Sequence, residues 1–292
     1  MRVRAVPREQ IRTVLKEDWI DRNRSPYAEG DTLWVPVIDG AAFDRVIPDK
    51  HPYAGRGFFM IGEIAVVHGK KPARSEVEEI VQFRHPLGVV WIESLNEVTR
   101  KPSTEVLFGE VGETRHQENG YTFFLDPQRV MFSQGNRVEK LLMAALVKES
   151  GLHERVADMF AGIGYFTIPM AGSGGSVHAM EINPVAYGYL ERNIIANGLS
   201  DCVTTSLGDC RALLAGTYHR IIMGHFDAIE MLPSALKHVE AGSTIHVHSI
   251  GSVENRIVEC CAGAGFSPTI MVHKVKKYRP HAWHVVQDVT LL

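Results

Sequence analysis

The chain has few cysteines, no long apolar run and no leader-like N-terminus. Each of these shortages excludes a class of protein. Its 292 residues include Cys202, Cys210, Cys260 and Cys261, without a C-x-x-C pair or the spacing of a secreted disulfide framework. No hydrophobic run reaches membrane-spanning length, and the arginine-rich start lacks the apolar core of a signal peptide. We therefore expect free thiols and a soluble, cytoplasmic protein.

The chain also lacks a strong charge of either sign, since its net charge is -3 at pH 7. The basic residues are nevertheless uneven. Residues 1–24 contain four acids and seven basic residues, and the basic ones are Arg2, Arg4, Arg8, Arg12, Lys16, Arg22 and Arg24. Residues 272–284 contain no acid and four basic residues, Lys274, Lys276, Lys277 and Arg279. Such clusters can meet phosphates, although a solvated surface is the commoner meaning of any one of them.

The second half of the sequence alternates between strand and helix patterns. The strands are predicted at Val156–Phe160, Val177–Glu181, Val203–Leu207, Arg220–Gly224, Thr244–Ser249, Thr269–Lys274 and Trp283–Leu291. Helices are predicted from about Tyr165, over Val185–Asn197 after the cap Asn183-Pro184, over Ile229–Val239 and over 253–264. This alternation indicates a mostly parallel sheet with helices on both faces, and a ligand at the carboxyl ends of its strands.

One turn in this half has the residues of a nucleotide-type site. The run Asp158-Met159-Phe160-Ala161-Gly162-Ile163-Gly164 ends a strand in a glycine turn, and Glu181 ends the next strand. Glycines allow a close backbone approach, and a second-strand carboxylate can accept from two ribose hydroxyls. The acid Asp158 would repel a pyrophosphate but suits a ligand with an ammonium and a sulfonium. The pattern, including Phe160, predicts S-adenosylmethionine; the alternative is an ordinary strand-to-helix turn.

Four further residues are candidates for the same ligand. Asp209 follows the third strand, where its carboxylate can accept from the adenine amine, and the backbone N–H of Cys210 can face the ring. A turn pair and a small buried thiol are the alternatives. Ser133 and Lys140 precede the glycine turn, and a hydroxyl and a cation there can hold the methionyl carboxylate. The alternative for this pair is a capped surface helix.

No metal site is expected. His246 and His248 share one face of a strand because strand side chains alternate, but no third ligand converges on them. A structural histidine pair is the favoured interpretation. Cys260 and Cys261 lie in a predicted amphipathic helix, point in different directions and are expected to pack passively.

The first half reads as a smaller α+β domain. Short strand-like segments at Phe58–Val67, Leu87–Glu93, Glu105–Phe108 and Tyr121–Leu125 are separated by Gly, Pro and charged turns. We predict an N-terminal domain over residues 1–125. A helix over Asn136–Val147 leads into a Rossmann-like catalytic domain over residues 126–292.

The segment after the fourth strand lacks a residue that amino-directed methyltransferases have. Many of them place Asn or Asp there, often before Pro-Pro-aromatic, to grip the target amine. This chain has Met223-Gly224-His225-Phe226-Asp227 instead. The usual apparatus for methyl transfer to an exocyclic amine is therefore missing.

Five stretches resemble the archaeal wyosine-synthesis 3-amino-3-carboxypropyl transferases. They are Met131-Phe132-Ser133, the run 158–164, Glu181-Ile182-Asn183-Pro184, Met223-Gly224-His225 and 278–286. The related tRNA guanine-37 N1-methyltransferases share the fold, and the segments 112–120 and 124–126 resemble both groups. The likeness runs from about residue 58 to the end. It implies a class I, Rossmann-like S-adenosylmethionine-dependent transferase acting on the anticodon loop of tRNA-Phe.

The resemblance also implies residue roles. Ser133 and Lys140 would contact the amino acid end of the cofactor, Glu181 the ribose, and Asp209 with Cys210 the adenine. Two residues depart from the family, which commonly has Arg in place of Lys140 and Asn in place of Cys210. Lys140 replaces a bidentate fork with a point charge, and Cys210 is a weak donor.

The implied reaction consumes S-adenosylmethionine as a co-substrate. A sulfonium activates three neighbouring carbons, and the fold decides which one faces the nucleophile. Positioning and a built-in leaving group would then carry the transfer to 4-demethylwyosine at position 37, with 5′-methylthioadenosine as the product. No catalytic side chain is assigned. A guanine-37 N1-methyltransferase and a non-catalytic nucleotide- or RNA-binding module are the alternatives.

Overall fold

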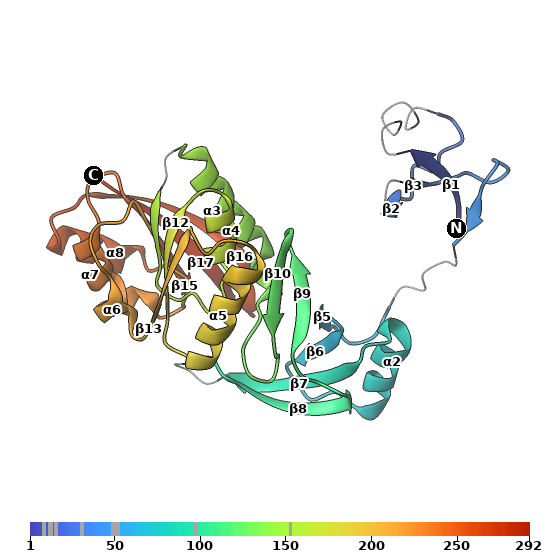
Figure 1. The fold of residues 1–292 in the computed structure, drawn as a ribbon, viewed down its shortest axis with the longest axis horizontal. Coiled ribbons are helices and arrows are strands. Elements are labelled where there is room, and N and C mark those ends of the chain that lie inside the picture. Colours follow the sequence, from blue (N-terminus) through green and yellow to red (C-terminus); the bar gives the residue numbers. More distant parts are fainter. Residues whose placement is uncertain are drawn as a thin grey trace. The chain divides into compact units, whose positions relative to one another are not determined.

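The computed structural model describes the whole chain except residues 8, 9, 11–13, 15, 16, 30, 31, 48–52, 96–98, 152 and 153. The chain divides into two compact units, Met1–Ala54 and Gly55–Leu292 (Figure 1). Three of the N-terminal basic residues, Arg8, Arg12 and Lys16, lie outside the described residues. Among the described residues, no helix combines the length and apolarity needed to cross a membrane.

The first unit is built on a four-stranded antiparallel sheet. Its strand order is β2 (Tyr27–Glu29), β3 (Thr32–Pro36), β1 (Arg2–Pro7), β4 (Arg45–Val46). Val6, Ile20 and Val35 form its small core. Arg4 stacks over the ring of Trp19 at 5.0 Å, so at least one basic residue of this unit packs on an aromatic side chain.

The second unit begins with a four-stranded sheet in the order β5 (Phe59–Ile61), β6 (Ile64–His68), β7 (Gly88–Leu95), β8 (Pro102–Gly109). The strand predicted over 58–67 is two strands, because Gly62 at φ +55° turns the chain between them. Helix α2 (Arg74–Arg84) connects β6 to its parallel neighbour β7, and a hairpin of β9 (Thr114–Glu118) and β10 (Tyr121–Leu125) follows. The pattern had predicted neither α2 nor β9.

A seven-stranded sheet forms the rest of this unit and confirms the Rossmann-like fold. Its order is β13 (Val203–Leu207), β12 (Ser176–Glu181), β11 (Arg155–Asp158), β14 (Arg220–Met223), β15 (Thr244–Ile250), β17 (Ala282–Leu291), β16 (Pro268–Arg279). The first five strands are parallel, and β17 is antiparallel to both of its neighbours. The order reverses direction between β11 and β14, where ligands of such sheets bind.

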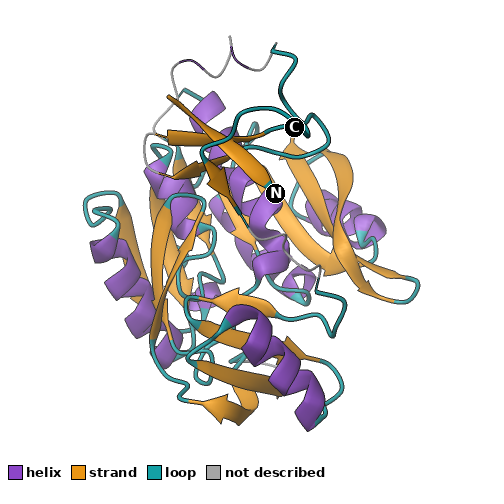
Figure 2. Cartoon of the chain, turned by 90° about the vertical axis from the view of Figure 1, so that its right-hand side faces the viewer, coloured by secondary structure: helices purple, strands orange, loops and turns teal. Residues whose placement is uncertain are grey.

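Helices flank both faces of this sheet (Figure 2). The helices α3 (Arg137–Glu149), α4 (Thr167–Gly172) and α5 (Pro184–Ala196) pack on one face. On the other face lie α6 (Cys210–Leu213), α7 (Leu232–Ala235) and α8 (Glu254–Gly263). The five α5 residues predicted at helical spacing are all buried, namely Ala186, Tyr189, Leu190, Asn193 and Ile194.

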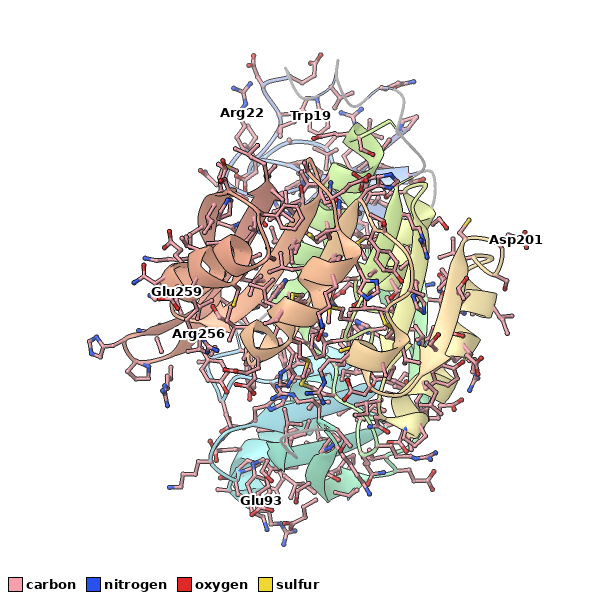
Figure 3. All side chains as sticks on the ribbon, turned by 90° about the vertical axis from the view of Figure 1, so that its left-hand side faces the viewer. Trp19, Arg22, Glu93, Asp201, Arg256 and Glu259 are labelled. Carbon is pink, nitrogen blue, oxygen red and sulfur yellow. The ribbon has the colours of Figure 1, made fainter. Side chains whose placement is uncertain are left out.

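The prediction of one helix over Ile229–Val239 is wrong, because the structure has three short helical segments there. These are η3 (Ala228–Met231), α7 and η4 (Leu236–His238). Pro233 lies in the first turn of α7 and has no N–H to continue the hydrogen bonds of η3, so the helix restarts there. Helix α8 is close to the predicted bounds, and Arg256 and Glu259 project from it (Figure 3). Its thiols differ as expected, because Cys261 is buried and Cys260 is partly exposed.

Two asparagines, one in α5 and one at its C-terminal cap, bind the backbone of β10. The Asn193 carboxamide accepts from Phe124 N at 2.7 Å and donates to Phe124 O at 3.2 Å. The Asn197 carboxamide makes the same pair of bonds with Thr122, at 2.9 and 2.7 Å. Four helical residues rise about 6 Å and two strand residues rise slightly more, about 6.5 Å, so the two pairs match. These bonds cross residue 125, which lies inside the second unit; the domain boundary expected there stays a prediction.

Candidate active site

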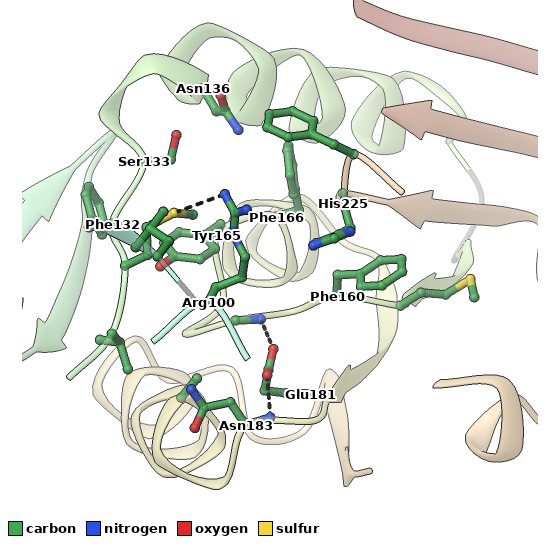
Figure 4. A pocket seen from close by; sticks show the side chains of 18 of the residues that line it. Arg100, Phe132, Ser133, Asn136, Phe160, Tyr165, Phe166, Glu181, Asn183 and His225 are labelled. Carbon is green, nitrogen blue, oxygen red and sulfur yellow. Dashed lines mark hydrogen bonds between the residues drawn. The ribbon is translucent and has the colours of Figure 1, made fainter. Parts of the chain in front are cut away.

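A cavity of about 870 Å³ lies at the carboxyl ends of the parallel strands. Its wall also includes residues from β5, β6, the end of β7 and the segment between β7 and β8, so the small sheet and the large sheet share it. The predicted cofactor residues that line it are Ser133, Lys140, Phe160, Gly162, Glu181, Asp209 and Cys210. Figure 4 shows part of this wall. The size is that of a small-molecule site.

Asp158 is the predicted cofactor residue that does not line the cavity. It is fully buried, and it accepts from Thr167 Oγ at 2.7 Å and from Phe160 N at 3.3 Å. Burial raises the pKa of Asp158 to about 6. The carboxyl therefore ties the end of β11 to the start of α4, which fixes the glycine turn between them.

Glu181 is held by the turn that it faces. One carboxylate oxygen accepts from Gly162 N at 2.8 Å, and the other accepts from Asn183 N at 2.6 Å (Figure 4). Gly162 has φ +58°, a left-handed conformation that costs glycine little and lets the chain turn here. Burial raises the pKa of Glu181. Both oxygens keep lone pairs, so a carboxylate of fixed orientation lines the cavity.

Lys140 forms a buried ion pair instead of facing the cavity with a free charge. Its Nζ lies 2.7 Å from Glu118 Oε1, and both side chains are almost completely buried. The ammonium also lies over the rings of Phe132 and Tyr165, at 4.6 and 5.2 Å. Desolvation lowers the pKa of Lys140 in spite of the attraction of Glu118. Its charge is therefore largely compensated within the protein.

Two cations in the cavity wall carry no predicted cofactor role. Lys276 donates to Ser133 Oγ at 3.1 Å, although the sequence grouped this lysine with a surface cluster. Arg100 extends into the cavity, where its guanidinium lies 3.7 Å from Met131 Sδ (Figure 4). Arg100 has φ +54° and no motif around it, so no sequence signal marks it.

Asp209 and Cys210 lie together at the start of α6. Asp209 caps this helix, accepting from Arg211 N at 3.0 Å, and its carboxylate is paired with the Arg211 guanidinium. The hydrogen bond from the Arg211 guanidinium is the main cause that lowers the pKa of Asp209. The Cys210 thiol lies 3.8 Å from Met231 Sδ, and burial raises its pKa to about 11, so it stays protonated.

The segment after β14 presents an imidazole where amino-directed methyltransferases have an amide or carboxylate. The His225 ring is stacked on Phe160, with centroids 5.4 Å apart and planes at 25°. Its Nδ1 accepts from Asp227 N at 3.2 Å. A Cβ on Gly224 would lie 3.3 Å from Phe166, so this backbone packs closely against an aromatic side chain. The arrangement presents the stacked rings of Phe160 and His225 where such enzymes have an amide or a carboxylate.

The histidines of β15 are structural. His246 is hydrogen-bonded to Arg220 and Asp288, both at 2.6 Å. His248 Nδ1 lies 2.9 Å from His284 Nε2. Over the described parts of the chain, no group of three or more His, Cys, Asp or Glu side chains is placed to hold a metal ion.

The sheet order and the cavity define a Rossmann-like, class I transferase. The TRM5/TYW2 methyltransferase domain profile matches residues 114–266, which is more than half of the chain. The chain is 33% identical over 240 residues to the tRNA(Phe) (4-demethylwyosine(37)-C(7)) aminocarboxypropyltransferase of Methanocaldococcus jannaschii, covering 78% of this chain and 95% of that protein. The chain thus belongs to the TRM5/TYW2 family.

Two solved structures show how far the likeness extends. M. jannaschii TYW2 in complex with AdoMet is 30% identical, with a TM-score of 0.65, and it covers 80% of this chain and 99% of its own. Wild-type Trm5b from Pyrococcus abyssi is 26% identical, with a TM-score of 0.72, and it covers 99% of this chain and 98% of its own. The chain is similar to both branches of its family.

Proposed function

We propose that this protein transfers the 3-amino-3-carboxypropyl group of S-adenosylmethionine to C7 of 4-demethylwyosine at position 37 of tRNA-Phe. The observation that carries the proposal is the 33% identity to the aminocarboxypropyltransferase of M. jannaschii along 95% of that enzyme. The wall of Gly224 and His225 supports it, because a base that reacts through carbon needs no grip on an amine.

The cavity suits S-adenosylmethionine along its whole length. The fixed carboxylate of Glu181 can accept from the ribose hydroxyls, and Asp209 with Cys210 lies where the adenine would be recognised. Phe160 supplies a flat aromatic ring to the wall, and Gly162, which has no side chain, allows a ligand to approach the backbone closely. Ser133, at the cationic end, fits the methionyl group.

The proposed reaction forms one carbon–carbon bond and breaks one carbon–sulfur bond. C7 of the base attacks the methylene carbon by which the aminocarboxypropyl arm is attached to the sulfonium. The electron pair of the broken carbon–sulfur bond goes to sulfur. Sulfur leaves in 5′-methylthioadenosine, and C7 loses its proton as the ring regains aromaticity. The leaving group is already present, so the protein contributes by aligning the two carbons and excluding water.

The test is the identity of the small-molecule product. The protein is incubated with tRNA-Phe carrying 4-demethylwyosine and with S-adenosylmethionine labelled either in the carboxyl or in the methyl group. The carboxyl label should enter tRNA, and the methyl label should stay in methylthioadenosine. S-adenosylhomocysteine as the main product, with the methyl label in tRNA, would contradict the proposal.

A second candidate is a tRNA guanine-37 N1-methyltransferase. One observation favours it, because the likeness to Trm5b extends over 99% of this chain and so includes Met1–Ala54, whereas the likeness to TYW2 covers 80%. The same assay with tRNA carrying an unmodified guanine 37 separates the two. On either candidate, residues 1–125 would contribute contacts to tRNA around its anticodon loop.

A further inference from the structure

One end of the cavity has three cations, of which one is paired with an acid. Arg100, Lys140 and Lys276 all line the cavity. Lys140 is paired with Glu118, whereas no carboxylate of the described residues pairs with Lys276. The nearest polar partner of Lys276 is the Ser133 hydroxyl, at 3.1 Å. A partly buried ammonium with only a hydroxyl partner keeps donors available for an anion.

A β-bulge turns Lys276 toward the cavity. Lys274 is opposite Val285 of β17, and Lys276 is opposite His284, so Val275 is an extra residue between them. In a regular strand the side chains of residues 274 and 276 would share a face, but the bulge puts them on opposite faces. The Nζ of Lys274 lies over the exposed ring of Trp283, away from the cavity wall that contains His284.

Gly135 leaves room for this lysine. A Cβ on residue 135 would lie 2.8 Å from both Cδ and Nζ of Lys276. Gly135 belongs to the 3₁₀ turn Gln134–Asn136 that follows Ser133 and leads into α3. A larger residue would therefore push the ammonium away from the Ser133 hydroxyl. The glycine, the serine and the bulge together build one position for a cation.

The electrostatic environment of this position favours an anion. Desolvation lowers the pKa of Lys276, and the charges of Lys140 and Arg100 lower it further. A negatively charged ligand would offset all three effects at once. Lys276 and Ser133 both line a cavity of small-molecule size, so a small anion on a flexible arm fits this position better than a polymer backbone.

We propose that Lys276, together with Ser133, binds the carboxylate of the aminocarboxypropyl group, in the place first expected for Lys140. This inference rests on the proposed function, because it assumes that S-adenosylmethionine is the ligand. It makes Lys276 a specificity residue, since this carboxylate distinguishes the transferred group from the part that leaves. Methylthioadenosine has no such carboxylate and would not contact Lys276.

The test compares the two ligands by calorimetry. Lys276→Met keeps the length of the side chain and removes its charge. Its dissociation constant for S-adenosylmethionine should rise by about tenfold or more, as for loss of a charged hydrogen bond. Its affinity for 5′-methylthioadenosine should stay within about twofold of wild type. Lys237→Ala removes an exposed charge from η4 and serves as the matched control, with both affinities unchanged.

A second variant reaches the same site without removing the lysine. Gly135→Ala should displace the ammonium and weaken S-adenosylmethionine binding, again with little effect on methylthioadenosine. The inference is overturned if Lys276→Met binds S-adenosylmethionine like wild type, or if both ligands lose affinity equally. These outcomes are independent of the product assay, because failure of the proposed function shows in the wild-type protein as a different product or as no binding of either ligand.

Discussion

Glu181 has a structural task as well as a predicted binding task. Its two oxygens hold the N–H groups of Gly162 and Asn183, so they are oriented before any ligand arrives. A carboxylate that is already fixed loses little conformational entropy on binding. The glycine turn and the acid therefore act as one unit, although they are separated in sequence.

The variant Glu181→Gln should weaken S-adenosylmethionine binding by about tenfold or more. Glutamine keeps one acceptor oxygen, but its NH₂ group would face a backbone N–H, and the charged acceptor for the ribose is lost. Calorimetry on the folded variant measures the change, with the thermal midpoint as a check on the turn. An unchanged dissociation constant would remove Glu181 from the ligand site.

The buried pair His248 and His284 should make stability depend on pH. Burial is the main cause that lowers the pKa of His284 to about 4 and that of His248 well below 6.5. The unfolded chain therefore binds more protons between these values, and the stabilisation present above pH 6.5 is lost as the pH falls toward 4. Asp158, with its raised pKa, acts in the opposite direction and remains in every variant.

Urea unfolding between pH 4 and 6.5 measures this effect. His284→Gln can still donate to His248, and the free energy of unfolding should change less steeply with pH than in wild type. His281→Asn is the control, because His281 is exposed at φ +62°, a conformation that asparagine tolerates. If His284→Gln keeps the wild-type slope, this histidine does not carry the pH dependence.

At the scale of elements, α5 is held to β10 by side chains that imitate a neighbouring strand. Asn193→Ala should lower the free energy of unfolding by roughly 1–3 kcal/mol, because it removes the partners of the partly buried N–H and C=O of Phe124 and of the buried Ile163 carbonyl. Urea denaturation gives the value. Glu191→Ala, on the exposed side of the same helix, should change stability by about 0.5 kcal/mol or less. Equal effects of the two variants would contradict a specific role of the carboxamide.

The sequence predicted those elements whose own side chains repeat with a clear period. Helix α5 and strand β13 were placed within a residue of their bounds, because apolar residues, a cap and Gly198 mark them. Strand β9 was missed, since its residues are mostly charged or polar and only pairing with β10 makes it a strand. The broken helix after β14 was missed because Pro233 is tolerated in a first turn, which hid the restart.

The candidate site was predicted where local motifs define it. The glycine turn and Glu181 are adjacent in the sheet, and their spacing in sequence shows this. The partner of Lys140 lies in β9, a strand that the pattern missed, and the direction of Lys276 depends on one extra residue in β16. Neither the ion pair nor the bulge leaves a mark on the sequence.

At the scale of the whole molecule, tRNA must be met by local positive charge, since the net charge is -3. The exposed Lys277 remains the basic residue of β16 best placed for this, next to the cavity mouth that it lines. Lys277→Ala should lower the slope of log affinity for tRNA against log salt by about 0.7–0.9, and leave S-adenosylmethionine binding unchanged. Filter binding over a salt series checks it. A wild-type slope would mean that Lys277 is simply solvated.

The position of β16 and β17 in the chain has a consequence for how the protein is made. The cavity wall needs residues of β16 and β17, namely Lys276, Lys277, Tyr278 and His284, which the ribosome adds after every other described residue of that wall. A nascent chain can therefore form the glycine turn early and still leave the cavity open on one side. The ligand can then bind tightly only to the finished sheet, so it protects mature molecules from unfolding and proteolysis without assisting the early steps of their folding.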